Sequence, residues 1–170
     1  MSSLRVRDAL ERLRRVFLER PAAARRASST ATSVWQEGLR FVTTGPAGEK
    51  ALTDMPEAMG GNAAGCNPGW LLRAAMASCA GTVVAMQAAR RGIELTSIEV
   101  TVDSESDARG LVGIDGVPTS LSNLRMTIRL GADNIPESVL RELAGWAATE
   151  SVVSRTLREG PPVTVEISVV

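Results

Sequence analysis

The chain has 170 residues, and its 19 lysine and arginine residues balance its 19 aspartate and glutamate residues. A balanced charge provides no overall field to attract nucleic acid, and the length suits one domain with its own core. Because histidine is absent, the chain can form neither a Ser-His-Asp or Cys-His catalytic site nor a His-ligated metal site.

The first segment, residues 4–19, has the spacing of an amphipathic helix, with an apolar residue every three or four positions. Two interpretations are open. Either its apolar stripe packs on the rest of the chain, or its arginine-rich polar face meets a membrane or nucleic acid. Interspersed carboxylates dilute the positive charge and favour the first. We expect residues 1–29 to form this helix and a linker, ahead of a domain spanning residues 30–170.

Residues 30–54 have the alternation of β-strands, interrupted by turns at Glu37-Gly38 and at residues 45–48. A glycine-rich loop over residues 55–65 then leads to a long apolar segment. This loop is not a phosphate-binding P-loop, because Cys66-Asn67 stand where that motif needs lysine followed by serine or threonine.

The longest predicted element is a helix from Pro68 to Arg91, about 36 Å long at about 1.5 Å per residue. Asn67 can cap it, Pro68 suits its first turn, and Gly92 suits its end. Arg73 interrupts the apolar run too early for a membrane span. A helix that is apolar on all sides should be buried on most of them.

Strands are predicted at residues 98–103 and 124–130, with a further short strand near residues 111–114. Helices are predicted at residues 136–148 and 151–158, followed by a last strand at residues 163–169. The order of these elements indicates an α+β fold, since a parallel sheet would need a helix between most strands.

The two cysteines carry the candidate chemistry. Cys66 and Cys79 would lie roughly 20 Å apart along one helix, so they cannot form a disulfide within the chain. A thiol in the middle of a helix is either an inert core residue or a nucleophile ionised by a cation from another element. With two cysteines and no convincing targeting segment, the chain is expected to be cytoplasmic, without a metal or other cofactor.

The long helix resembles the signature of the OsmC/Ohr family. The resemblance is carried by the run Asn67-Pro68-x-x-Leu71-Leu72-x-Ala74-Ala75-x-Ala77-x-Cys79 and by Gly92-Ile93. Supporting matches are the Gly60-Gly61 loop, the strand that leads to Asp107-x-Arg109-Gly110, and the stretch from Ser151 to Leu157. The resemblance covers about residues 30–170.

This resemblance implies an OsmC-like fold, in which curved antiparallel sheets wrap a long central helix and two chains form an intertwined homodimer. It also implies thiol-dependent reduction of organic hydroperoxides. In that chemistry a peroxidatic cysteine becomes a sulfenic acid, and a second cysteine condenses with it to a disulfide. No nucleic acid partner and no membrane insertion are expected.

By the same resemblance, Cys79 is the peroxidatic cysteine. Ser151 occupies the position of the family's second cysteine, and Gly69 occupies the position of its acidic residue. Arg40 is our candidate for the arginine that ionises the thiol. Cys66 could replace the missing second cysteine only from another subunit or a moving loop, and we expect that it does not.

Two functions of different classes remain open. The first is a thiol peroxidase that acts through Cys79 alone in defence against oxidative stress, with an external thiol as reductant. The second is a non-catalytic OsmC-like protein that binds a small apolar ligand at the dimer cleft, which the altered Ser151 and Gly69 positions motivate.

Overall fold

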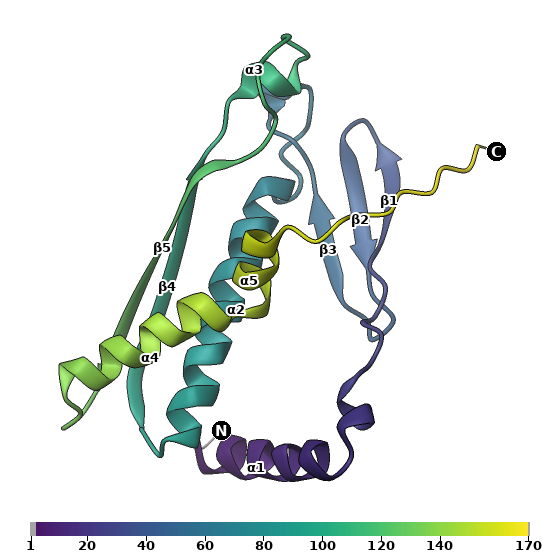
Figure 1. Ribbon diagram of the computed structural model, residues 1–170. Coiled ribbons are helices and arrows are strands. Elements are labelled where there is room, and N and C mark those ends of the chain that lie inside the picture. The colour runs from purple at the N-terminus through teal and green to yellow at the C-terminus, as the bar shows by residue number, and fades with distance from the viewer. Residues whose placement is uncertain (1–2, 170) are drawn as a thin grey trace. The chain divides into compact units, whose positions relative to one another are not determined.

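The computed structural model describes residues 3–169, which form helices and two small sheets (Figure 1). The chain divides into two compact units. The first contains the residues up to Arg7, Ala75–Val102, and the residues from Met126 onward; the second contains Asp8–Ala74 and Asp103–Arg125. Each unit is described by itself. The mixture of helices and small sheets agrees with the α+β fold expected from the sequence.

The second unit contains a three-stranded antiparallel sheet in the order β1-β2-β3. Its strands are β1 (Thr32–Glu37), β2 (Arg40–Thr44) and β3 (Lys50–Thr53). Gly38 adopts a φ of 53° in the first turn, a value that favours glycine. All of β1 is exposed, and the Trp35 side chain is 61% exposed. Among residues 3–169, no segment therefore buries a side chain of β1.

The long helix α2 runs from Pro68 to Arg90, as the sequence predicts (Figure 1). The Asn67 side chain accepts a hydrogen bond from the Gly69 N–H at 2.8 Å and so caps the first turn. At the other end, Gly92 adopts a φ of 69°, and the Ile93 N–H donates back to the Ala88 carbonyl. The capping residues thus define both ends of this helix.

Within the first unit, α2 packs one stripe of side chains into the core. Met76, Ala80, Val84 and Ala88 recur every four residues and are buried. Most other α2 side chains are half-buried or exposed, so the expectation of burial on most sides fails for one chain. Among residues 3–169, α2 is the one helix long and apolar enough to cross a membrane, a test that core helices also pass.

The core of the first unit lies between α2 and α4 (Glu137–Glu150). Leu143 and Ala147 of α4 are completely buried against Val84 and Ala88, with Ile93 beside them. Burial of these side chains supplies the main stabilisation of this unit.

Strands β4 (Leu95–Glu105) and β5 (Ser122–Ala132) form a second, two-stranded sheet. Across them Glu99 pairs with Arg129 at 3.6 Å and Asp103 with Arg125 at 3.0 Å, which is the register of an antiparallel pair. The predicted short strand near residues 111–114 is wrong. One helical turn, α3 (Ala108–Leu111), is found there, because the Asp107 side chain accepts from the Arg109 N–H and caps it.

The C-terminal part contains α5 (Val152–Glu159), which ends at Gly160 with a φ of 55°. The predicted strand at residues 163–169 is wrong for the single chain: its residues have no regular structure, and Val163, Val165, Ile167 and Val169 are between 72% and 91% exposed. A strand forms only when a neighbour accepts its ladder of hydrogen bonds, and no strand within residues 3–169 pairs with this tail.

The N-terminal helix α1 spans Ser3–Glu19 and carries no buried side chain. A short 3-10 turn, Pro21–Ala24, follows it. Residues 25–31 then connect it to β1 without regular structure.

Candidate functional site

The glycine-rich loop ahead of α2 is held by one buried carboxylate, that of Asp54. Asp54 is 2% exposed and accepts three backbone hydrogen bonds, from the N–H groups of Met55 (2.8 Å), Asn62 (3.0 Å) and Ala64 (3.1 Å). The Ala64 N–H above all, with those of Met55 and Asn62 and the charge of Arg40, lowers the pKa of Asp54, although burial opposes this. Asp54 therefore fixes the path of the chain into α2.

We expect this support to be lost in acid. Because folding lowers the pKa of Asp54 below its ordinary 3.8, the carboxylate stabilises the fold above that pH and ceases to do so as pH falls through its folded value. Asp54→Asn should be less stable at neutral pH, since its NH₂ group would face N–H donors. Urea unfolding from neutral pH to about pH 3 should show a smaller acid-induced loss in this variant than in the wild type. Equal losses would contradict the assignment.

Cys66 lies immediately before α2 and is tied to β3. Its N–H donates to the Leu52 carbonyl at 3.1 Å, and its carbonyl accepts from the Asp54 N–H at 3.2 Å. Its thiol also points to the Leu52 carbonyl, at 3.3 Å. Cys66 is therefore held through both its backbone and its side chain. It could condense with a sulfenic acid at Cys79 of the same chain only if its segment moved, and these hydrogen bonds oppose such a movement.

Cys79 lies in the middle of α2, within the first unit, and is a half-buried free thiol. Its neighbours on the helix, Met76 and Ala80, are buried, whereas Ala75 and Thr82, one turn away on either side, are exposed. Cys79 thus lies at the edge of the buried stripe and is not enclosed in the core of the single chain, as an inert core cysteine would be.

Ser151 lies at the start of α5 and is completely buried. Its Oγ accepts a hydrogen bond from the Ser154 N–H at 3.3 Å and shares a second, of 2.7 Å, with the Ser154 hydroxyl. The hydroxyl therefore caps the helix and is fully satisfied. Sequence reasoning missed the part of Ser154, whose i+3 spacing from a serine at a helix start was the available signal.

Gly69 lies close to the side chains of Asn67 and Arg73. A Cβ at this position would lie 3.0 Å from Oδ1 of Asn67, which is a tight contact, and 3.8 Å from Nη1 of Arg73. An acidic residue at position 69 would therefore meet the Arg73 guanidinium. In this chain Arg73 donates to the Ser104 hydroxyl at 3.1 Å, and no carboxylate pairs with it among residues 3–169.

Arg40 lies at the start of β2, in the second unit, where its guanidinium pairs with Glu37 at 2.8 Å. Its charge also acts on Asp54. Cys79 belongs to the other unit, so the pairing of Arg40 with this thiol stays a prediction. Among residues 3–169, no three cysteine, aspartate or glutamate side chains are grouped so that they could hold a metal ion.

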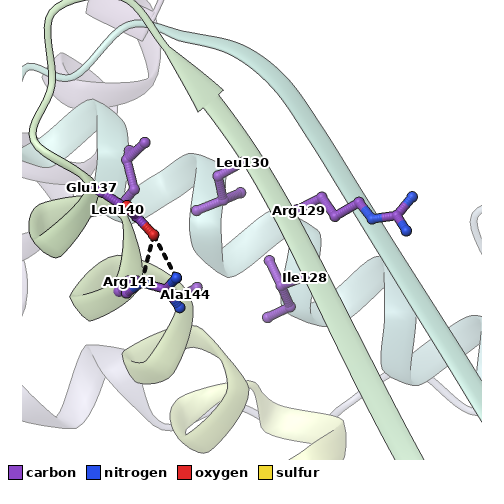
Figure 2. A pocket seen from close by; sticks show the side chains of 7 residues that line it. All are labelled: Ile128, Arg129, Leu130, Glu137, Leu140, Arg141 and Ala144. Carbon is purple, nitrogen blue, oxygen red and sulfur yellow. Dashed lines mark hydrogen bonds and ion pairs between the residues drawn. The ribbon is translucent and has the colours of Figure 1, made fainter.

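The first unit has an apolar hollow of about 440 Å³ between β5 and α4 (Figure 2). Ile128 and Leu130 of β5 face Leu140 of α4 across it. The ion pair between Glu137 and Arg141 lies on the helix side, where both side chains line the hollow. Cys79 does not line this hollow.

The sequence pattern of one family, described as OsmC-like protein, matches residues 60–166 and so covers more than half of the chain. The chain belongs to the OsmC-like protein family. None of the curated proteins compared with it matches. The matched region contains Gly69, Cys79 and Ser151, so the positions that the resemblance singles out all lie inside the family's own pattern.

Solved structures of OsmC-like proteins share the fold. The OsmC-like protein of Mycoplasma pneumoniae is 16% identical, with a TM-score of 0.65 over 79% of this chain and 89% of that one. An organic hydroperoxide resistance protein OsmC from Legionella pneumophila is 19% identical, with a TM-score of 0.57 over 78% of this chain and 90% of that one. OhrB of Bacillus subtilis, named an organic hydroperoxide resistance protein, is 21% identical, with a TM-score of 0.52 over 78% of this chain and 91% of that one. At these identities the likeness shows the fold alone. The OsmC-like fold predicted from the motif is confirmed for the single chain, and the homodimer stays a prediction.

Proposed function

We propose that this OsmC-like protein is a thiol peroxidase that reduces organic hydroperoxides through Cys79 and serves in defence against oxidative stress. The observation that carries the proposal is the family match, which includes α2 and its half-buried free thiol, Cys79; by the resemblance to the family motif we take this thiol to be the peroxidatic one. Two structural neighbours are named organic hydroperoxide resistance proteins, which supports this class of substrate. The proposed setting is the cytoplasm, where thiols stay reduced.

In the proposed reaction the Cys79 thiolate attacks one oxygen of the O–O bond. The bond breaks, the sulfur becomes a sulfenic acid, and the other oxygen takes a proton and leaves in the alcohol product. An external thiol then attacks the sulfenic sulfur, releasing water and forming a mixed disulfide. A second external thiol frees Cys79 and leaves in an external disulfide. Two thiols are oxidised for each hydroperoxide reduced.

The cycle uses an external thiol because the chain supplies no second sulfur at the family position. Ser151 carries a hydroxyl there, and Cys66 is tied to β3 by three hydrogen bonds. We further propose that Arg40 stabilises the thiolate, since a thiol in mid-helix needs a cation from another element.

The test is hydroperoxide consumption by the full chain with excess dithiothreitol. Cumene hydroperoxide should be consumed with one dithiothreitol, which carries two thiols, oxidised per hydroperoxide. After brief exposure without reductant, dimedone should label Cys79 as a sulfenic acid and leave Cys66 unlabelled. No consumption together with no label would refute the proposal.

One observation favours a second function, the binding of a small apolar ligand: the apolar hollow between β5 and α4 has room for one. The same experiment separates the two functions. A pure binding protein should leave Cys79 unlabelled by dimedone, and native Cys79 should react slowly with iodoacetamide.

We also propose that the protein is an intertwined homodimer. Three apolar surfaces of the single chain support this proposal: strand β1, the unburied sides of α2, and the tail of residues 163–169. Trp70 and Trp146 are 51% and 41% exposed, so they are not core residues of one chain, and we propose that they are dimer anchors.

Light scattering should give twice the chain mass of 17.9 kDa. Ile167→Asp, on the apolar side of the tail, should weaken the dimer at least about tenfold, because burying an isoleucine contributes about 1.5–3 kcal/mol. Ser168→Asp adds the same charge on the other side of the tail and should leave the dimer nearly intact. A monomeric wild-type chain would contradict the proposal, and equal effects of the two substitutions would exclude the tail from the interface.

A further inference from the structure

The N-terminal helix α1 lies outside the region that matches the family, and the proposed peroxidase chemistry does not use it. Residues 1–28 contain eight of the 19 basic residues of the chain and three of the 19 acidic ones. This segment therefore has a net charge of +5, and the remainder of the chain has a net charge of −5. The excess of positive over negative charge therefore lies in this one short segment.

The arrangement of these charges around α1 is specific. At about 3.6 residues per turn, Val6, Leu10, Leu13 and Phe17 form one apolar stripe. Four arginines lie along its two edges. They are Arg7 and Arg14 on one side, and Arg5 and Arg12 on the other, where Ala9 and Val16 widen the stripe. The side opposite the stripe holds Arg15 and the three carboxylates, Asp8, Glu11 and Glu19, together with the exposed Leu4 and Leu18.

The apolar stripe is only partly covered within the chain. No side chain of α1 is fully buried: Val6, Leu10 and Phe17 are half-buried, and Leu13 is 49% exposed. The side chains of Arg12 and Arg14 are exposed, and their guanidinium groups form no hydrogen bond or ion pair with other residues in the range 3–169. The exposed connection of residues 25–31 has a reach of up to about 25 Å when extended.

We propose that α1 binds the surface of an anionic lipid bilayer and lies parallel to it. In that position the stripe enters the boundary between headgroups and acyl chains, and the arginines at both edges extend to the lipid phosphates. The carboxylates face water, away from the anionic surface. A protein partner would require only an apolar stripe. Cations on both edges with anions opposite match a flat, negatively charged surface whose interior is apolar.

This binding is peripheral and leaves α2 in the core, so it agrees with the expectation of no membrane insertion. It would hold the protein at a membrane independently of any activity of Cys79, and its test uses no hydroperoxide.

The test is co-sedimentation of the full chain with vesicles of phosphatidylcholine alone or with added phosphatidylglycerol. The wild type should bind the anionic vesicles, bind the neutral ones weakly, and dissociate as salt is raised. Leu13→Glu should abolish binding. Its far-UV circular dichroism and thermal unfolding should match the wild type, because the side chain is not part of the core.

Three arginines of the same helix provide a matched comparison. Arg12→Gln and Arg14→Gln, at the two edges, should each weaken vesicle binding about fivefold. Arg15→Gln removes the same charge from the opposite side, about one helix diameter, or 10 Å, from the lipid. That distance is about one Debye length at 0.1 M salt, so its effect should be much smaller.

Three outcomes would overturn the proposal. One is failure of the wild type to bind anionic vesicles at low salt. Another is an equal effect of all three arginine substitutions, which would show diffuse attraction without a docked helix. The third is a change of oligomeric state caused by Leu13→Glu without vesicles, which would assign the stripe to a second copy of the chain.

Discussion

Replacing Cys79 by serine is expected to reduce hydroperoxide consumption by at least about 100-fold, to the rate of dithiothreitol alone. The substitution changes one atom on α2, at a position that is half-buried, so the helix and its buried stripe should be unaffected. What is lost is the thiolate, which is the nucleophile in the proposed reaction and the atom that accepts the oxygen. The measurement is peroxide concentration over time with excess reductant.

The matched control is Cys66→Ser, which replaces the only other thiol in the chain. A serine hydroxyl can keep the side-chain hydrogen bond to the Leu52 carbonyl, and the backbone links to β3 do not depend on the side chain. Cys66→Ser should therefore retain activity. If both variants lose activity equally, Cys66 takes part in the cycle. If neither loses it, the chemistry does not depend on a thiol.

The largest expected effect on stability is that of Leu143→Ala. Leu143 is completely buried between α4 and α2, where it contacts the cluster that contains Val84, Ala88 and Ala147. Removing its side chain loses the apolar transfer free energy and leaves a cavity, so we expect the free energy of unfolding to fall by about 2–5 kcal/mol. Urea or thermal unfolding at one fixed protein concentration measures it, because dimerisation would make stability concentration-dependent.

Leu111→Ala is the corresponding control, because Leu111 of α3 is 59% exposed. The same truncation there should change the free energy of unfolding by about 0.5 kcal/mol or less. If Leu143→Ala costs no more than the control, then α4 does not form a core with α2, and the packing described for the first unit is wrong.

The ends of α2 could be predicted because they depend on local chemistry. Asn67 caps the first turn through its own side chain, and Gly92 reaches positive φ without a Cβ clash, so neither needs a distant residue. The same holds for Ser151 at the start of α5 and for the local pairing of Asp107 with Arg109.

The role of Asp54 could not be predicted in this way. Its partners are backbone N–H groups of Met55, Asn62 and Ala64, and a backbone donor leaves no signature in the sequence. The partner of Arg73 was hidden for a related reason: Ser104 is 31 residues away, so which hydroxyl meets this guanidinium depends on how distant segments pack.

By itself, the sequence determined the fold class, the family, the extent of α2 and the position of Cys79 along it, because periodicity, caps and a specific motif are local properties of the chain. Tertiary structure alone decided which stripe of α2 is buried, that Asp54 holds the loop ahead of it, and that residues 163–169 form no strand in one chain. The physical reason is that burial and strand pairing require a partner surface. An alternating apolar pattern shows that a segment needs such a partner but does not identify it.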